Sequence, residues 1–307
     1  MPKSIDIAIP CYNEAVTIAK VVADFQAVLP EADIFVFDNN STDNSTAIAQ
    51  EAGAVVHQVR KQGKGQVMRA IFDTLTADVV VLVDGDDTYY AQDAPLLLEA
   101  LKQQDADMVV GNRLESASDE SMVRLHRYGN ALIGNIINRM FGTSYGDILS
   151  GYRVFSRSFI ETVPVLTSGF EVETEMTLQA LEEGLHLVEV PIRYRSRPEG
   201  SESKLRSFQD GWHILVTAAM LLRDHQPLRL FGIFSLLSGL IAFTAGLLRF
   251  SNYLALTAFS DALLTGIILL FAPIAVIAFG VGLILSAINT RFREMKQIMH
   301  RNKKFND

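Results

Sequence analysis

Two long runs of uncharged, mostly apolar residues lie near the carboxyl end of the chain, from Leu230 to Leu248 and from Ala262 to Thr290. They contain 19 and 29 residues, and about 20 apolar residues span the hydrocarbon core of a bilayer as a helix. Soluble helices seldom continue this far without a charge, so we expect two transmembrane helices. The alternative is a buried helical hairpin in a soluble protein.

The charges around these runs predict their orientation. The segment after the second run is rich in Lys and Arg, whereas the loop from Ser251 to Asp261 has neither. Because Lys and Arg collect in cytoplasmic flanks, we expect both termini in the cytoplasm, although Arg249 at the outer edge of the first run opposes this orientation.

The remainder of the chain has the features of a cytosolic domain. Asp6 interrupts the only early apolar stretch, so no signal peptide is expected. The single cysteine, Cys11, cannot form an intrachain disulfide, which fits a reducing compartment. We interpret it as a small core residue at the end of a strand.

Net charge divides the chain at the same place. Residues 228 to 307 contain 8 Lys and Arg against 3 Asp and Glu, whereas residues 1 to 227 contain 19 against 32. An acidic domain of this kind argues against nucleic acid as a partner. A basic tail suits anionic lipid headgroups, but the topology alone also requires one.

The acidic half alternates strand and helix patterns, which predicts an α/β fold with a mostly parallel sheet and helices on both faces. The expected strands are Ile5 to Ile9, Ile34 to Phe37, Ala54 to His57, Val79 to Val83 and Met108 to Val110. The expected helices are Ala15 to Val28, Asp43 to Ala52, Gln66 to Leu75 and Ala94 to Gln103.

Polar clusters follow the first, second and fourth of these strands, where ligands bind in such sheets. Helix caps and turns could account for any one cluster. After the fourth strand, however, Asp84, Asp86 and Asp87 place three carboxylates within four positions. Because like charges at this spacing repel one another, the pattern favours a bound Mg²⁺ or Mn²⁺ that is shared with a diphosphate.

A series of motifs follows in a fixed order along the chain: the Pro-Xaa-Tyr-Asn-Glu opening, the Asp38 loop, Gly63-Lys64-Gly65, the Asp-Xaa-Asp of Asp84 and Asp86, Gly111-Asn112-Arg113, and the run from Asp147 to Arg153. This series resembles family 2 glycosyltransferases of GT-A (Rossmann-like) fold, and among them the polyprenyl-phosphate glycosyltransferases. This group includes dolichyl-phosphate mannose synthases and bactoprenol glucosyltransferases.

The resemblance implies roles for single residues on the donor side. Nucleotide contacts would come from Pro10, Tyr12, Glu14, Asp38, Lys64 and Asp84, and the metal ligands would be Asp84 and Asp86. Two departures from the family's patterns bear on the donor. Asp38-Asn39-Asn40 replaces the commoner Asp-Asp-Gly, and Asp84-Gly85-Asp86 differs from the Asp-Xaa-Gln of some mannose synthases. The second gives a slight preference for a UDP-hexose over GDP-mannose.

On the acceptor side, a polyprenyl phosphate dianion needs cationic groups more than a strong base, because its second pKa is near 6. Arginine suits this purpose because its planar fork pairs with phosphate oxygens at two points. Acceptor-phosphate contacts are assigned to Arg113, Arg127, Arg153, Ser203 and Lys204, and the catalytic residues to Asp147, Arg113 and Arg153. Asp147 would position the acceptor or act as a weak base. A surface salt bridge or a loop cap is the alternative for each.

We therefore expect a cytosolic glycosyltransferase domain over residues 1–206, an amphipathic interfacial helix over 207–227, a transmembrane hairpin over 228–290 and a basic tail over 291–307. The expected partners are a nucleotide-sugar donor, a polyprenyl (undecaprenyl or dolichyl) phosphate and the membrane, and glycines in the apolar runs offer contact faces for a homo-oligomer. A processive synthase is disfavoured because its Gln-Xaa-Xaa-Arg-Trp motif is missing around Trp212. A non-catalytic nucleotide-sugar sensor is the alternative from a different class.

Overall fold

A computed structural model shows the chain as two compact units, residues 1–211 and 212–307. It describes residues 4–114, 124–169, 171–198, 216, 220, 222–253 and 260–304; within these, side chains are described except at 124–130, 293 and 296–304. Most of the predicted interfacial helix, over 207–227, lies outside the described residues.

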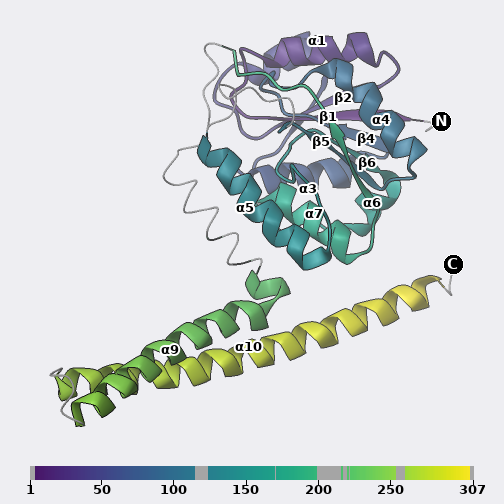
Figure 1. Ribbon diagram of the computed structural model, residues 1–307. Helices are drawn as coiled ribbons and strands as arrows, with labels where there is room; N and C mark the ends of the chain where they lie inside the picture. Colours follow the sequence, from purple (N-terminus) through teal and green to yellow (C-terminus); the bar gives the residue numbers. More distant parts are fainter. Residues whose placement is uncertain are drawn as a thin grey trace. The chain divides into compact units, whose positions relative to one another are not determined.

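The first unit is built on a seven-stranded sheet with the order β3-β2-β1-β4-β6-β5-β7 (Figure 1). The strands are β1 (Ile5–Cys11), β2 (Asp33–Asp38), β3 (Val55–Gln58), β4 (Val79–Leu82), β5 (Met108–Asn112), β6 (Arg153–Ser156) and β7 (Leu187–Pro191). All neighbours pair in parallel except β6, which runs antiparallel to both β4 and β5. The predicted mostly parallel α/β sheet is confirmed.

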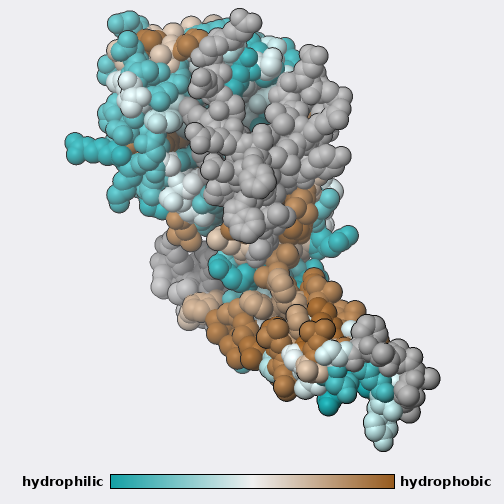
Figure 2. Space-filling model, turned by 90° about the vertical axis from the view of Figure 1, so that its left-hand side faces the viewer, coloured by the Kyte–Doolittle hydropathy of each residue, from teal (hydrophilic) through white to brown (hydrophobic). Residues whose placement is uncertain are grey.

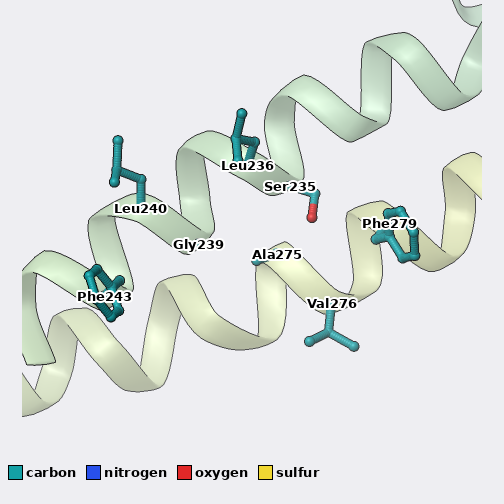
Figure 3. A pocket seen from close by; sticks show the side chains of 8 residues that line it. All are labelled: Ser235, Leu236, Gly239, Leu240, Phe243, Ala275, Val276 and Phe279. Atoms are coloured by element: carbon teal, nitrogen blue, oxygen red, sulfur yellow. The ribbon is translucent and has the colours of Figure 1, made fainter.

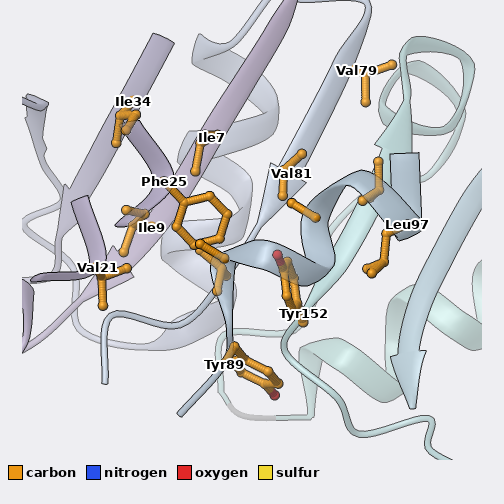
Figure 4. Packing of buried hydrophobic residues seen from close by; sticks show 14 of the residues in the cluster. Ile7, Ile9, Val21, Phe25, Ile34, Val79, Val81, Tyr89, Leu97 and Tyr152 are labelled. Atoms are coloured by element: carbon orange, nitrogen blue, oxygen red, sulfur yellow. The ribbon is translucent and has the colours of Figure 1, made fainter. Parts of the chain in front are cut away.

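Helices cover both faces of the sheet because the strands other than β3, at the edge, bury side chains on both sides. One core lies beneath α1 (Ile18–Val28), α2 (Ser45–Glu51) and α4 (Ala94–Gln103), with the short helix η1 (Ala91–Asp93) before α4 (Figure 4). The opposite core lies beneath α3 (Lys64–Thr74), α6 (Arg157–Thr162) and α7 (Val172–Glu182). Helix α5 (Arg124–Phe141) follows β5 in the chain.

The sequence pattern located five strands and four helices to within a few residues, but it predicted neither β7 nor β6. This strand has only four residues, and a buried arginine, Arg153, begins it. Neither a continuous apolar run nor a clear alternation marks such a segment. Its insertion between β4 and β5 brings the residues just before it to the edge where the acids of the β4 loop lie.

The second unit is a helical hairpin of α9 (Pro227–Tyr253) and α10 (Asp261–Lys304). Both helices are long and apolar enough to cross a membrane, over Pro227–Tyr253 and Asp261–Phe292. Large apolar side chains such as Phe234, Leu236 and Val276 are mostly exposed, and hydrophobic surface covers much of the hairpin in Figure 2. Since little of either span is buried within the protein, both helices are candidate membrane spans.

Small residues let the two helices approach. Gly239 on α9 faces Ala275 on α10, and a Cβ atom at Gly239 would lie 3.8 Å from that of Ala275. Gly239 and Ala275 line a shallow groove between the two helices, and Ser235, one turn before Gly239, lines the same groove (Figure 3). Contacts of this kind are typical of helices that pack within lipid. Helix α10 continues to Lys304, beyond the end of its apolar run.

Candidate active site

The loops that follow β1 and β2 are tied together by side chains. Ser41 Oγ accepts a hydrogen bond from the Asn13 amide at 2.9 Å, and Asn13 Oδ1 accepts one from the Thr42 amide at 2.8 Å. Asn13 has a φ of 54°, in the left-handed region that asparagine tolerates. Of the predicted nucleoside residues, Pro10 lies in β1, and Tyr12 and Glu14 lie on the loop after it, which the β2 loop holds in place.

Asp38, at the end of β2, is 1% exposed. Its Oδ2 atom accepts a hydrogen bond from the Ser41 amide at 3.1 Å, whereas its Oδ1 atom has no hydrogen-bond partner in the described structure. An unsatisfied buried carboxylate oxygen costs free energy, so it calls for an explanation. A donor group on a bound ligand would supply one.

The Gly63-Lys64-Gly65 turn is held by two segments that are distant in the sequence. Asn39 Oδ1 accepts a hydrogen bond from the Gly63 amide at 2.7 Å, and the Gly65 amide donates to Ser168 O at 3.2 Å. Gly63 has a φ of 127°, and a Cβ atom there would overlap Ser168 O. Only glycine fits at position 63, because the backbone of Ser168 lies so close to it. The turn that this contact fixes places Lys64 at the start of α3.

Lys64 bridges two carboxylates. Its Nζ atom lies 2.8 Å from Asp84 Oδ1 and 2.6 Å from Glu173 Oε1 of α7. Burial alone would lower the pKa of this lysine, but the two carboxylates outweigh burial and raise it well above its usual value. Lys64 is therefore a permanent cation, and it links the loop after β4 to the start of α7.

The acids after β4 are also paired with cations. Asp86 Oδ2 lies 2.6 Å from Arg197 Nη2, and its Oδ1 atom accepts a hydrogen bond from Thr88 Oγ1 at 2.7 Å. Asp87 pairs with Lys20 at 3.0 Å and with Arg195. Each carboxylate of the predicted cluster thus has a positive partner, which reduces the repulsion among the three.

Asp84 and Asp86 differ in their titration. Burial raises the pKa of both carboxyl groups, but at Asp84 the charge and hydrogen bond of Lys64, together with the charges of Arg113 and Arg197, outweigh burial and lower the pKa. At Asp86, burial and the negative charge of Asp84 raise the pKa despite Arg197. The more exposed acid, Asp84, is therefore the more firmly ionised of the two.

Asp147 and Arg113 form a buried ion pair. Asp147 is 0% exposed, and its two oxygens accept hydrogen bonds from Arg113 Nε at 2.8 Å and Nη2 at 2.9 Å. The Arg113 amide also donates to Asp147 Oδ2, at 3.0 Å, and Glu189 accepts hydrogen bonds from the amides of Gly146 and Asp147. Because both oxygens of Asp147 accept hydrogen bonds from Arg113, the carboxylate fixes the orientation of the guanidinium group.

Asp84 lies directly against the turn that begins with Asp147. A Cβ atom at Gly151 would overlap Asp84 Oδ2. The Gly151 amide donates to Tyr89 Oη at 3.0 Å, and Arg113 Nη1 donates to the same oxygen at 3.4 Å. The predicted metal-ligand side and the Asp147–Arg113 pair therefore form one continuous polar centre.

Arg153 lies beneath this centre. It is 0% exposed and donates to Ile148 O at 2.6 Å, Ser150 O at 2.9 Å and Thr177 Oγ1 at 3.1 Å. Burial lowers the pKa of its guanidinium to about 10, which still leaves it charged at neutral pH. In this structure Arg153 has no surface that a phosphate could contact, and its donors hold the turn from Asp147 to Ser150.

Other predicted acceptor residues fall where no side chain is described. Arg127 belongs to α5, but its side chain lies outside the described part, and Ser203 and Lys204 lie outside it altogether. Their assignment to the acceptor phosphate stays a prediction.

The structure also adds residues that the sequence motifs did not assign. Tyr89, Glu189 and Arg197 all contact members of the polar centre. The period of two in Arg193, Arg195 and Arg197 was a visible signal of an extended segment with one charged face. Nothing in the sequence indicated the partners of Tyr89 or Glu189.

The donor set after β4 is compatible with Mg²⁺ or Mn²⁺. Among the described side chains, no group of three or more His, Cys, Asp or Glu residues is arranged to hold a metal ion. These two cations commonly use only one or two carboxylates, and complete their shell with water and substrate phosphates. Asp84 and Asp86 fit that requirement when a diphosphate supplies the other oxygens.

Residues 6–163 match the family model for glycosyl transferase family 2. Glycosyltransferase AglJ of Haloferax volcanii is 37% identical over 232 residues, which cover 75% of this chain and 76% of the relative. A dolichyl-phosphate hexose transferase of the same organism is 30% identical over 65% of this chain and 86% of the relative. An undecaprenyl-phosphate mannosyltransferase of Micrococcus luteus is 29% identical over 64% and 85%.

Among solved structures, glucosyl-3-phosphoglycerate synthase of Mycobacterium tuberculosis, in complex with Mn²⁺ and UDP, superposes with a TM-score of 0.58. The match covers 71% of this chain and 78% of that one at 20% sequence identity. At this identity the similarity concerns the fold.

The buried pair yields a stability prediction. Asp147→Asn should lower the free energy of unfolding by about 3 kcal/mol, because it leaves the Arg113 charge buried without a counter-ion. The double variant Arg113→Met/Asp147→Asn should lose less than the sum of the single variants Arg113→Met and Asp147→Asn. Urea unfolding of the detergent-solubilised chain, followed by circular dichroism, measures all four proteins. Additive losses would show that the two side chains are not coupled.

Proposed function

Because this chain belongs to glycosyl transferase family 2, we propose that it transfers a hexose from a nucleoside-diphosphate sugar to a polyprenyl phosphate at the cytosolic face of a membrane. That the chain is a glycosyltransferase follows from its family. The lipid acceptor is supported by relatives that are named for dolichyl phosphate and undecaprenyl phosphate. The two apolar helices support a membrane location for the reaction.

One observation carries the proposal: the acids Asp84 and Asp86 and the Arg113–Asp147 pair meet in one polar centre, with Gly151 against Asp84. Transfer between two phosphate-bearing substrates needs sites for two anions side by side. The acids with their cation would hold the departing diphosphate, and Arg113 would hold the incoming phosphate. Their adjacency brings the sugar carbon within reach of the lipid phosphate.

The chemistry is a single displacement. An oxygen of the lipid phosphate attacks the anomeric carbon, the bond from that carbon to the diphosphate oxygen breaks, and the configuration at the carbon inverts. A phosphate monoester with a second pKa near 6 is already largely a dianion at neutral pH, so no proton has to be removed. Both oxygens of Asp147 are engaged by Arg113, which suits positioning of the guanidinium rather than proton transfer.

Asp84 and Asp86 would hold a divalent cation, which when bound would stabilise the charge that develops on the leaving diphosphate. Lys64 remains positive beside Asp84 and offers a further cation to the same phosphates. Arg153 is assigned a positioning role: it holds the carbonyls of Ile148 and Ser150, and through them the Asp147 turn.

Asp38 supports uridine diphosphate as the carrier. Only its Oδ1 atom lacks a partner, since Oδ2 accepts a hydrogen bond from the Ser41 amide. Uracil offers a single imide donor, whereas the corresponding edge of guanine offers an imide and an amino donor side by side. One unsatisfied oxygen therefore matches uracil better, and a ribose hydroxyl is the other donor that it could accept.

Product extraction tests the function. The purified chain is incubated with Mg²⁺, undecaprenyl phosphate and a panel of labelled nucleotide sugars, and label in the organic phase is counted. We expect a labelled lipid with a UDP-hexose, and Asp86→Ala should lower the rate at least about 100-fold because charge stabilisation is lost.

Other results of this assay would favour other functions. If only GDP-mannose gives a labelled lipid, the donor is GDP-mannose and not a UDP-hexose, and the proposed transfer to polyprenyl phosphate still holds. Label in long polymer would favour a processive synthase, and nucleotide-sugar binding without any product would favour a sensor. Undiminished turnover by Asp86→Ala would contradict its role at the diphosphate.

The role of Asp38 is tested by calorimetry. Asp38→Asn should weaken UDP binding about tenfold, since a hydrogen bond to a charged acceptor contributes about 1.5 kcal/mol. Asp33→Asn, at the exposed start of the same strand, is the control and should bind UDP as the original chain does. Equal UDP affinity in the two variants would remove Asp38 from the nucleoside site. Ribose 5-diphosphate, which has no base, distinguishes the two possible contacts. If Asp38 contacts the ribose, Asp38→Asn should also bind this ligand more weakly, whereas if Asp38 contacts the base, the binding of this ligand should not change.

Cysteine labelling tests the orientation. Cys11 is 2% exposed, so it should not react in the folded chain. Ser260→Cys, between the two helices, should react with an impermeant maleimide added outside intact cells, and Gln103→Cys on the exposed surface of the first unit should react only after lysis. The reverse pattern would place the sheet outside the cytosol.

A further inference from the structure

The segment from Ile192 to Pro198, here called the arginine strap, runs along the loop that follows β4. Tyr194 forms an antiparallel bridge with Tyr89, and the Arg195 amide donates to Thr88 O at 3.0 Å. An extended chain places alternate side chains on one side. Arg195 and Arg197 consequently face acids of the β4 loop, and Arg193 faces Asp93 of η1.

Each arginine of the strap pairs with a different aspartate. Arg193 contacts Asp93 at 2.6 Å, Arg195 contacts Asp87, and Arg197 contacts Asp86 at 2.6 Å. The first two also stack on Tyr90, with Cζ atoms 4.8 and 4.5 Å from the ring centre. Arg193 and Arg195 thus attach the strap beside the active centre, and Arg197 extends from this anchor to Asp86.

Arg197 takes the oxygen that a cation would need. Asp86 Oδ1 is engaged by the hydroxyl and amide of Thr88, at 2.7 and 3.2 Å, whereas Oδ2 faces the Arg197 guanidinium. A metal ion that binds through Oδ2 would lie close to a guanidinium whose Nη2 atom is 2.6 Å from that oxygen, and the two positive groups would repel one another. The arginine and the cation therefore compete for one atom.

Charge leads to the same conclusion. Lys64, which Asp84 shares with Glu173, and Arg197 on Asp86 place two positive charges among three carboxylates. Much of the negative charge is thus compensated before any cation binds. Displacing Arg197 restores this balance only if the released guanidinium gains another anion.

We propose that Arg197 is the resident counter-ion of Asp86, that a divalent cation displaces it, and that the nucleoside diphosphate arriving with the cation then becomes its partner. The inference rests on the proposed function for the identity of the ligands. If Arg197 exchanges partners in this way, the protein should bind a divalent cation weakly without the nucleotide and strongly with it. Arg197 is then a binding residue for the departing diphosphate, which none of the sequence motifs assigned.

Mn²⁺ binding to the full-length chain in detergent tests this without any turnover. Free Mn²⁺ is measured by electron paramagnetic resonance, with and without UDP, for the original chain, Arg197→Gln and Arg193→Gln. Arg193 is the matched control, because it belongs to the same strap but pairs with Asp93 instead of Asp86. Without it, the Arg195–Asp87 pair and the hydrogen bond from the Arg195 backbone amide to Thr88 O still attach the strap. Arg197 is 29% exposed, so its replacement leaves no large cavity.

Without UDP, Arg197→Gln should bind Mn²⁺ about tenfold more tightly than the original chain, because its competitor is gone. With UDP this advantage should vanish or reverse, because the diphosphate loses its arginine. Arg193→Gln should match the original chain in both conditions. Adding Asp86→Asn to Arg197→Gln should abolish the gain, which would confirm that the competition is for Asp86.

Unchanged or weaker Mn²⁺ binding by Arg197→Gln in the absence of UDP would overturn the inference. So would an equal gain in Arg193→Gln, since it would reflect general loss of positive charge. The proposed function is decided separately by the extraction assay. If the original chain forms the lipid product but Arg197→Gln does not change Mn²⁺ affinity, the proposed function stands and the role of Arg197 is refuted. If Arg197→Gln binds Mn²⁺ more tightly but no lipid product forms, the role of Arg197 stands and the proposed function is refuted.

Discussion

Buried carboxylates at the carboxyl edge of the sheet are held by cations that come from other parts of the chain. Lys64 from the start of α3 binds Asp84 and Glu173, Arg113 from the end of β5 binds Asp147, and Arg197 binds Asp86. Removing Arg113 would leave the fully buried Asp147 without its counter-ion, at a cost of about 3 kcal/mol. The position of each loop around the site is therefore coupled to charge balance as much as to packing.

The same arrangement prepares the centre for ligands that carry charge of their own. A diphosphate, a lipid phosphate and a divalent cation together would add both signs to a site that is already near balance. Groups with fixed partners, such as Arg113 on Asp147, keep their geometry when ligands arrive. Groups whose partner is itself a metal-ligand candidate, such as Arg197 on Asp86, exchange it instead.

Strand β6 explains why the two halves of the site meet. It lies antiparallel between β4 and β5, so the turn from Asp147 to Tyr152 lies at the edge of the sheet where β4 ends and its loop begins. Gly151 allows Asp84 to approach this turn, and Arg153 fixes the turn from below. An arginine that the motif pattern assigned to the acceptor phosphate thus supports the site from inside the fold.

The sequence alone determined the α/β class, most strand and helix positions, the two candidate membrane spans and the set of acids at the strand ends. These features depend on local periodicity, on run length and on the order of motifs, which a single chain displays directly. Only the tertiary structure decided the antiparallel place of β6, the burial of Arg153 and the pairing of Lys64 with Glu173 or of Arg197 with Asp86. Each of these joins residues far apart in the chain, and a charge gives no sign in the sequence of which distant opposite charge will neutralise it.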